Sequence, residues 1–312
     1  MSAVLVTGGA GFIGSHLVDA LLGRGHDVVV LDNLSTGSRD NVHADAELVE
    51  GDVADGGAVR EAFAVRSFDA VLHVAGQASI AKSFDEPERD LRVNVAGTLN
   101  VVEQAIASGV RRLLHASSMT AYGEPRTIPT PESEPCIPVS NYGVTKYASE
   151  RYVHVAGARD DVDLAVTSLR MFNVYGERQS LTNPYQGVLA IFVGNVLRGE
   201  SITIHSDGEQ TRDFVYVGDV VDAWLRLLDN RATAGQVYNV GSGRETTIAE
   251  LARAVVRACG HDEWEITTGR AQLGDLRRSC ADVSELQSAT GWQPATSLDD
   301  GMRRTVDWAR AD

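Results

Sequence analysis

Long hydrophobic runs are missing from this chain. None of its apolar stretches approaches the ~18 residues that a membrane-spanning helix requires. No positively charged segment precedes Val4, as it would in a secretory signal peptide. We therefore expect no membrane partner and a cytoplasmic location.

Cysteine and histidine are few and dispersed. The three cysteines, Cys136, Cys259 and Cys280, are odd in number and widely spaced, which argues against a disulfide framework and offers no metal-binding pair. The eight histidines are equally scattered. The sequence therefore gives no support to metal-dependent catalysis, and we expect no metal.

Positive charge is in deficit, because 28 Lys and Arg residues oppose 43 Asp and Glu residues, for a net charge of −15. The resulting field repels nucleic acids and anionic membranes, so we expect neither as a partner. Screening over a Debye length of roughly 8 Å still lets an anionic small molecule bind where a few arginines converge. Lysine is nearly absent, with only Lys82 and Lys146 against 26 arginines. Genome composition and a salty habitat could each produce that bias.

A glycine-rich segment is the strongest motif present. Residues 7–14 read TGGAGFIG, follow an apolar run and open a helical stretch. Strand, glycine turn and helix in this order form a dinucleotide-binding unit. In it Gly8 permits the tight turn, Gly11 lets the backbone approach a pyrophosphate, and Gly14 lets helix and strand pack closely. The pyrophosphate then binds at the N-terminus of the helix.

A second apolar strand, 28–31, ends in Asp32, eighteen residues past Gly14. A carboxylate at that place accepts hydrogen bonds from the ribose hydroxyls of adenosine and repels a 2′-phosphate, so NAD is favoured over NADP. The polar turn 33–37 that follows suits the same ribose, and residues 51–53 (GDV) are expected to meet the adenine edge.

Strands and helices alternate along most of the chain. We expect strands at 3–6, 28–31, 47–50, 69–74, 112–116, 213–217 and 236–240, and helices at 15–22, 89–108, 186–198, 220–228, 247–259, 284–290 and 297–310. This rhythm predicts an α/β fold, with a Rossmann-type, doubly wound parallel sheet and a smaller C-terminal α/β lobe that binds substrate. We place the dinucleotide-binding domain at 1–172, rejoined by about 215–242, and the lobe at 173–214 and 243–312.

Five of the eight prolines lie between Pro125 and Pro138 and predict a stiff extended loop. The loop leads into a helix on which Tyr142 and Lys146, four residues apart, share one face. A tyrosine with a pKa near 10 is a poor base at neutral pH. An ammonium about 4–5 Å away could favour the phenolate by on the order of two pKa units. The pair, with the serines at 117–118 that end the fifth strand, predicts an acid–base site beside the dinucleotide.

Taken together, these segments resemble the extended short-chain dehydrogenase/reductase family, and within it the NAD-dependent nucleotide-sugar epimerases similar to UDP-glucose 4-epimerase. The resemblance covers the whole chain. It is carried by residues 7–14, Asp32, the serine pair with Tyr122-Gly123, Tyr142-x-x-x-Lys146, RMFNVYG at 170–176, NPYQG at 183–187 and GEQTRDFVYV at 208–217.

The motifs and the resemblance together assign site residues. The NAD site would comprise Gly8, Gly11, Phe12, Ile13, Gly14, Asp32, Asn33, Ser35, Thr36, Gly37, Asp52, Val53, Val74, Ala75, Gly76, Asn94, Ser117, Tyr142, Lys146 and Phe172. The substrate site would comprise Ser118, Asn173, Val188, Arg212, Asp275 and Ser279. Of these, Arg212 is suggestive without any relative, because a guanidinium fork matches a diphosphate and the residue lies in a Gly-rich polar loop.

The resemblance implies a 4-epimerase of a nucleotide-activated hexose, most simply a UDP-sugar, with Ser118, Tyr142 and Lys146 as catalytic residues. Ser279 falls where epimerases confined to UDP-glucose tend to carry a bulky tyrosine. The shorter side chain leaves room for an N-acetyl group, so we expect the N-acetylhexosamines to be accepted as well. Related proteins pair through the helices near 87 and after 142, and we expect a homodimer to which Tyr152, Val153 and Val155 contribute.

Two other functions are open. A 4,6-dehydratase or a decarboxylase could share the fold, but the dehydratases carry an Asp-Glu pair where this chain has Met119, Thr120 and Ala121. A binding module that kept the NAD fold and lost the chemistry is the other alternative. Such modules normally lose the tyrosine or the lysine, and both are present.

Overall fold

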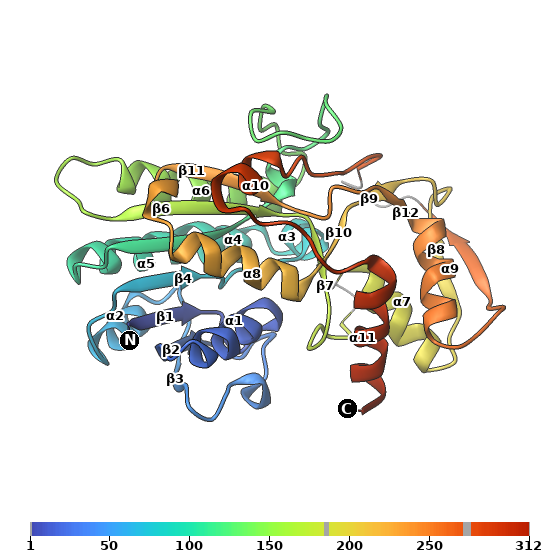
Figure 1. The fold of residues 1–312 in the computed structure, drawn as a ribbon, viewed down its shortest axis with the longest axis horizontal. Coiled ribbons are helices and arrows are strands. Elements are labelled where there is room, and N and C mark those ends of the chain that lie inside the picture. The colour runs from blue at the N-terminus through green and yellow to red at the C-terminus, as the bar shows by residue number, and fades with distance from the viewer. Residues whose placement is uncertain (1, 184–186, 271–275, 312) are drawn as a thin grey trace.

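The structure, a computed structural model, describes residues 2–183, 187–270 and 276–311. A seven-stranded sheet lies at its centre (Figure 1). Its strands are β1 (Ala3–Thr7), β2 (Asp27–Asp32), β3 (Glu47–Glu50), β4 (Ala70–His73), β5 (Arg112–Ser118), β6 (Ala165–Met171) and β11 (Gln236–Val240). They follow the order β11-β6-β5-β4-β1-β2-β3, and all neighbouring pairs are parallel. The doubly wound parallel sheet predicted from the sequence is confirmed, and its strand order reverses at β1, where ligands of such sheets bind.

Helices cover both faces of the sheet (Figure 1). One face is covered by α1 (Phe12–Gly23) and α8 (Val217–Leu228), the other by α2 (Gly56–Ala64), α5 (Gly97–Ala107) and α6 (Asn141–Gly157). The side chains of β1 alternate between the two layers: Val4 and Val6 pack with α1 and α8, and Leu5 packs with α2 and α5. A sheet buried on both sides explains why its strands appear in the sequence as continuous apolar runs.

The chain from β4 to α5 does not form one regular helix as predicted for 89–108. It forms α3 (Ile80–Asp85), α4 (Pro87–Leu91) and a π-helical turn, η2 (Arg92–Ala96), before α5 begins. Pro87 stands at the first position of α4, where the missing N–H costs nothing. Single π-helical turns within helices occur often at functional sites, and η2 carries Asn94.

The smaller lobe, on the right of Figure 1, has its own apolar core. Its elements are α7 (Val188–Leu197), β8 (Ile202–His205), β9 (Thr211–Arg212), β12 (Thr246–Thr247), α9 (Ile248–Ala258), β13 (Ile266–Gly269) and α11 (Leu298–Ala311). Two short strands, β7 (Asn173–Tyr175) and β10 (Phe214–Tyr216), pair where the chain passes between sheet and lobe. The remaining elements are α10 (Ser284–Thr290) and the 3₁₀ turns η1 (Arg39–Asn41), η3 (Met119–Ala121) and η4 (Arg231–Thr233).

The structure differs from the sequence predictions at several elements of the second half. Strands β6, β8 and β13 were not predicted, and α8 begins at Val217, where a strand was expected to continue. In β6 the apolar run is interrupted by Thr167, Ser168 and Arg170, all of which are buried with hydrogen-bond partners. Because their hydrogen-bond partners come from other parts of the chain, these polar residues can be buried in a central strand that the sequence does not show as an apolar run.

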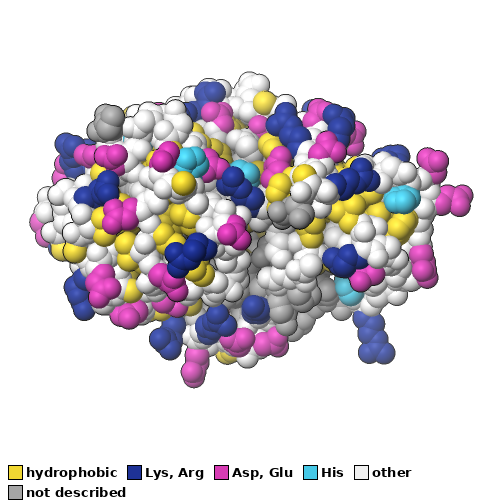
Figure 2. All heavy atoms as spheres, turned by 90° about the horizontal axis from the view of Figure 1, so that it is seen from below, with side chains coloured by type: hydrophobic (Ala, Val, Ile, Leu, Met, Phe, Trp, Pro, Cys, Tyr) yellow, Lys and Arg dark blue, Asp and Glu magenta, His cyan; other side chains and the backbone are white. Residues whose placement is uncertain are grey.

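The surface carries mixed charge. In Figure 2 acidic side chains and arginines are interspersed over the face shown, which agrees with a chain whose negative excess is spread widely. Within the described residues, no helix combines the length and the apolar character that crossing a membrane requires.

Candidate active site

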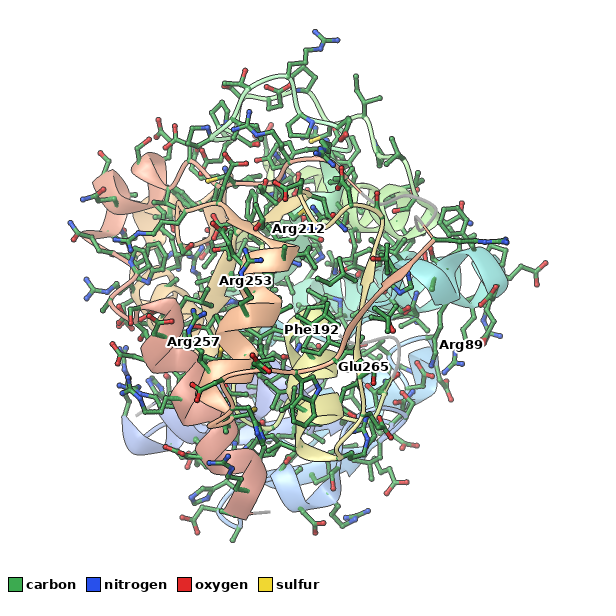
Figure 3. All side chains as sticks on the ribbon, turned by 90° about the vertical axis from the view of Figure 1, so that its right-hand side faces the viewer. Arg89, Phe192, Arg212, Arg253, Arg257 and Glu265 are labelled. Carbon is green, nitrogen blue, oxygen red and sulfur yellow. The ribbon has the colours of Figure 1, made fainter. Side chains whose placement is uncertain are left out.

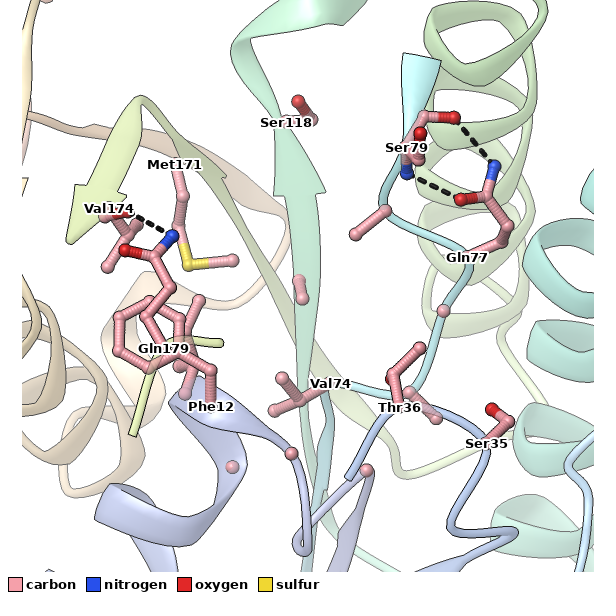
Figure 4. Close-up of a pocket in the computed structure, with 18 of the residues that line it drawn as sticks. Phe12, Ser35, Thr36, Val74, Gln77, Ser79, Ser118, Met171, Val174 and Gln179 are labelled. Carbon is pink, nitrogen blue, oxygen red and sulfur yellow. Dashed lines mark hydrogen bonds between the residues drawn. The ribbon is translucent and has the colours of Figure 1, made fainter. Parts of the chain in front are cut away.

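A cavity of ≈390 Å³ opens at the carboxyl ends of β1, β2, β4, β5 and β6 and extends to the smaller lobe. Eighteen of the predicted cofactor residues line it: Gly8, Gly11, Phe12, Ile13, Gly14, Asp32, Asn33, Ser35, Thr36, Asp52, Val53, Val74, Ala75, Gly76, Ser117, Tyr142, Lys146 and Phe172. The predicted substrate residues Ser118 and Asn173 line it as well. Figure 4 shows Ser118 between two walls, one formed by Phe12 and Gln179 and the other by Gln77 and Ser79.

The glycine loop forms a cradle that only glycine permits. Gly8 has φ +74°, a left-handed conformation that L side chains rarely adopt. A Cβ added to Gly14 would lie 2.0 Å from the carbonyl oxygen of Gly8, so α1 can approach the loop this closely only without a side chain there. The N-terminus of α1 thus faces the cavity with little to cover its N–H groups, which fits the pyrophosphate of a dinucleotide.

Asp32 ends β2 at the adenosine side of the cavity. Its carboxylate accepts hydrogen bonds from the backbone N–H groups of Ala10 at 3.0 Å and Leu34 at 2.8 Å. Burial raises the pKa of Asp32, and the two backbone hydrogen bonds act against that rise. Next to it the amide of Asn33 donates to Asp52 Oδ2 at 2.9 Å, so the residues predicted for the ribose and the adenine edge form one connected rim.

At the other end of the cavity Tyr142 and Ser118 both belong to the lining, and the hydroxyl of Ser118 acts to lower the pKa of the Tyr142 phenol. The hydroxyl oxygen of Ser118 accepts hydrogen bonds from the N–H of Thr120 at 3.2 Å and from its hydroxyl at 2.9 Å. With its acceptor sites occupied in this way, the proton of Ser118 is the group left to donate. Ser118 can therefore donate a hydrogen bond to a molecule in the cavity, and Tyr142 offers it an ionisable hydroxyl.

Lys146 lies one helical turn after Tyr142 and also lines the cavity. Its ammonium makes no hydrogen bond or ion pair at or below 4 Å with the residues that the structure describes, although the side chain is almost fully buried. A Cβ added to Gly76 would lie 3.8 Å from Lys146 Nζ, so the ammonium sits against the turn after β4. Burial lowers the pKa of Lys146 to about 8. A buried cation that faces a cavity in this way fits the hydroxyl groups of a bound ribose.

The pKa of Tyr142 differs from the sequence expectation. Burial raises it to about 12, the hydroxyl of Ser118 acts to lower it, and the negative charge of Asp90 raises it further. We had expected Lys146 to lower it. In the protein alone the loss of hydration exceeds any such attraction, so the phenolate requires an additional positive charge nearby.

Ser117 lines the cavity but does not direct its hydroxyl toward it. The hydroxyl donates to Glu150 Oε2 at 2.7 Å. Glu150 also receives two hydrogen bonds from Arg170, at 2.6 and 2.9 Å, in an ion pair whose side chains are 1% and 6% exposed. Successive residues of a strand face opposite sides of the sheet, so only Ser118 of the two serines can point toward Tyr142.

Proteins of known function resemble this chain in both sequence and fold. The NAD dependent epimerase/dehydratase family matches residues 4–241. The UDP-glucose 4-epimerase of Mycolicibacterium smegmatis is 42% identical over 313 residues, with 98% of each chain covered. The structure of the Thermotoga maritima UDP-glucose 4-epimerase with UDP-glucose has a TM-score of 0.94 at 40% identity, and the Thermus thermophilus enzyme with NAD has a TM-score of 0.92 at 40% identity, each with 99% of both chains covered.

The chain belongs to the NAD dependent epimerase/dehydratase family. NAD is its cofactor, and the resemblance inferred from the motifs is confirmed. Asp32 and Asp52, both at the adenosine end, are the carboxylates among the described residues that line the cavity. Beside Tyr142 the turn η3 offers Met119, Thr120 and Ala121 instead, so no carboxylate is placed there to assist loss of water.

Some residues predicted by resemblance to this family lie away from the cavity. Asn94 is buried and donates hydrogen bonds to Asp90 and Thr145 behind the cavity lining. Gly37 packs against the backbone of Ala10. Val188, Arg212 and Ser279 lie in the smaller lobe or at its edge and are not among the lining residues. Asp275 lies outside the described residues.

Arg212 and Ser279 are both buried. Arg212 Nη1 donates to the carbonyl oxygens of Thr211 and Leu276, at 2.6 and 2.8 Å, and Figure 3 shows the residue above α9, which carries Arg253 and Arg257. The hydroxyl of Ser279 contacts Met119 Sδ at 3.6 Å, and Met119 adjoins Ser118. Ser279 is thus one side chain away from Ser118.

Sequence reasoning missed further lining residues: Ser79, Lys82, Arg89, Arg178, Gln179 and Ser180. Most follow β4 or β7 and belong to turns. The rule that ligands bind beyond the carboxyl ends of strands could have identified Ser79. The described residues contain no group of three or more His, Cys, Asp or Glu side chains arranged to hold a metal ion.

Proposed function

We propose that this protein is an NAD-dependent UDP-glucose 4-epimerase, which interconverts UDP-glucose and UDP-galactose through a 4-keto sugar. The observation that carries the proposal is the placement of Tyr142, Lys146 and Ser118 together at the sugar end of a cavity whose other end has the glycine cradle and Asp32. The similarity to UDP-glucose 4-epimerases over the whole chain supports it.

Tyr142 acts as the general base and acid. Its phenolate takes the proton of the sugar 4-hydroxyl and returns it after the 4-keto sugar has turned its other face. Ser118 donates a hydrogen bond to the 4-oxygen throughout, because its own acceptor sites are occupied by Thr120. Bound NAD supplies reversible hydride acceptance at C4 and is regenerated in each cycle. A carboxylate beside Tyr142 would be needed for dehydration, and Met119–Ala121 provides none.

Lys146 would bind the ribose hydroxyls with its ammonium, and the positive charge of the oxidised nicotinamide ring would lower the pKa of the partly buried phenol of Tyr142. Both effects oppose the burial that holds the pKa of Tyr142 near 12 in the protein alone. The base is thus active only when the cofactor is in place, which protects the site from unproductive proton transfer.

The substrate residues assigned by resemblance stay part of this proposal. Asn173, which lines the cavity, Val188, Arg212 and Asp275 would contact the nucleotide and its diphosphate. Ser279 would adjoin the sugar 2-substituent by way of Met119, and its small volume would admit UDP-N-acetylglucosamine and UDP-N-acetylgalactosamine. We also propose the division into a dinucleotide domain (1–172 and about 215–242) and a substrate lobe (173–214 and 243–312).

A homodimer and a cytoplasmic location belong to the same proposal. Exposed apolar side chains gather on α3, α4 and α6: Phe84, Leu91, Val144, Tyr152 and Val155 are each at least 36% exposed. Val153, which we had expected at the interface, is 0% exposed and packs in the core of the monomer. Light scattering at micromolar concentration tests the dimer, and a monomer mass would contradict it.

The experiment that tests the function is incubation of the purified protein with UDP-glucose, UDP-galactose, UDP-N-acetylglucosamine, UDP-glucuronic acid and the dTDP-hexoses, followed by chromatography of the products. We expect the C4 epimer from the UDP-hexoses with no loss of mass. A product lighter by water or carbon dioxide would instead identify a dehydratase or a decarboxylase.

A further inference from the structure

Asp90, on α4, is a buried carboxylate that the proposed mechanism does not use. It is 0% exposed and is not among the lining residues of the cavity. Its Oδ1 accepts hydrogen bonds from Gln77 Nε2 at 2.7 Å and from Asn94 Nδ2 at 3.1 Å, and its Oδ2 accepts one from the hydroxyl of Thr145 at 2.6 Å. All three donors are neutral, so among the described residues no cation lies in hydrogen-bond contact with this charge.

The three donors come from three elements that surround the cofactor cavity. Gln77 lies in the turn after β4 and lines the cavity, where its side chain also bonds Ser79 (Figure 4). Asn94 lies in the π-helical turn η2 and accepts a hydrogen bond from the backbone N–H of Gln77 at 2.8 Å. Thr145 lies on α6, directly before Lys146. Asp90 therefore joins the cavity wall to the helix that carries the catalytic pair.

Lys146 is the cation that this charge acts on. Two carboxylates influence it, Asp90 from α4 and Glu150 from α6, and both raise the pKa of Lys146 against the effect of burial. Glu150 already receives two hydrogen bonds from Arg170, which neutralises it. Asp90 has no such counter-charge in hydrogen-bond contact.

The remaining titratable groups around Lys146 do not replace Asp90. His73 on β4 and His115 on β5 are fully buried, and burial lowers the pKa of both, so they are neutral. Tyr142, on the same face of α6, is protonated in the protein alone because burial raises its pKa to about 12. Asp90 is thus the carboxylate acting on Lys146 that has no cation in hydrogen-bond contact among the described residues.

We propose that Asp90 is a positioning residue, which keeps the ammonium of Lys146 charged and ties the Gln77 turn to α6. This proposal rests on the proposed function, in which Tyr142 transfers the proton and Lys146 holds the cofactor ribose beside it. A negative charge at Asp90 stabilises an ammonium and disfavours a phenolate, so its removal lowers the pKa of both residues. The rate of UDP-galactose epimerisation plotted against pH should rise with ionisation of Tyr142 and fall with deprotonation of Lys146. In Asp90→Asn we therefore expect both the rising and the falling side of this profile to move to lower pH, by on the order of one unit.

The scarcity of lysine allows a direct test that needs no substrate. Lysine labelled with ¹³C at Cε gives two signals, from Lys82 and Lys146, and a Lys82→Arg sample identifies which belongs to Lys146. We expect the titration midpoint of Lys146, measured by NMR on the NAD-loaded protein, to fall by on the order of one pH unit in Asp90→Asn. Glu88→Gln, which neutralises an exposed carboxylate of the same helix, should leave the midpoint unchanged.

An unchanged Lys146 midpoint in folded Asp90→Asn would overturn the proposal, as would an equal shift in Glu88→Gln. Asp90→Ser, which keeps one hydrogen-bonding oxygen, is the second charge-free variant if the asparagine does not fold, and the same shift is expected. A protein that shifts its midpoint yet epimerises none of the UDP-sugars would contradict the proposed function and leave the role of Asp90 supported. A purely structural role would lower NAD content without moving either the midpoint or the two sides of the pH profile.

Discussion

Asp32 Oδ2 accepts a hydrogen bond from the backbone N–H of Ala10 at 3.0 Å. The carboxylate at the end of β2 therefore holds the middle of the glycine loop that follows β1. The residue expected to bind the adenosine ribose also fixes the loop expected to bind the pyrophosphate. Two parts of the dinucleotide site thus depend on one side chain, and its charge and its hydrogen bonds can be tested separately.

Asp32→Asn removes the negative charge and keeps one oxygen that can accept a hydrogen bond from the backbone. We expect weaker NAD binding together with stronger NADP binding, because repulsion of the 2′-phosphate is lost. Calorimetric titration of the cofactor-free protein with both dinucleotides measures the two affinities. Asp27→Asn, at the exposed start of the same strand, is the matched control. An unchanged ratio of the affinities would remove Asp32 from cofactor selection.

Tyr142→Phe tests the assignment of the base. We expect turnover of UDP-galactose to fall by about 10²–10⁴-fold, the usual contribution of a general acid–base group, with NAD content intact. Tyr152 lies on the same helix and is 48% exposed. Tyr152→Phe also removes a phenol hydroxyl and should leave turnover unchanged. Full activity in Tyr142→Phe would exclude the tyrosine from the proton transfer.

Glu150→Gln tests the buried ion pair below the site. Loss of the charge leaves the guanidinium of Arg170 buried without its counter-ion, and breaking a buried pair typically costs about 3–5 kcal/mol. We expect a clearly lower urea midpoint. Asp161→Asn, in an exposed pair with Arg159, should leave the midpoint in place. Equal midpoints for the wild-type protein and Glu150→Gln would show that the pair does not stabilise the fold.

Ser279→Tyr tests the size of the sugar pocket. The hydroxyl of Ser279 contacts Met119, the neighbour of Ser118, so a ring at this position would press toward the sugar. We expect selective loss of activity on UDP-N-acetylglucosamine with UDP-glucose activity retained. Ser279→Ala, which adds no volume, is the control and should keep both activities. Equal loss of both activities in Ser279→Tyr would mean that the residue does not discriminate by size.

Short-range spacing predicted a group of residues that the structure brings together around one cavity. The glycine loop, Asp32 and the Tyr142–Lys146 pair each depend on a local pattern, a turn, a strand end or one helical turn, and all line one cavity. The upward shift of the pKa of Tyr142 could not be obtained this way, because the burial of its phenol depends on how separate segments of the chain pack around it.

Contacts between distant segments were beyond the sequence. Ser117 was assigned to the cofactor, yet it donates its hydroxyl to Glu150, 33 positions along the chain. Strand β6 went unrecognised because Arg170 interrupts its apolar run, and the counter-charge that a buried arginine requires comes from Glu150 on a different element. Polar residues whose partners come from other elements are the ones that composition and periodicity misplace.

The most direct test of the central claim uses UDP-galactose that carries deuterium at C4. The account predicts UDP-glucose as the product, with the deuterium kept at C4 when the reaction runs in ordinary water, because hydride leaves and returns within one closed site. Mass spectrometry and proton NMR of the product measure both the epimer and the label. Deuterium lost to solvent, or a product of different composition, would contradict the proposed function.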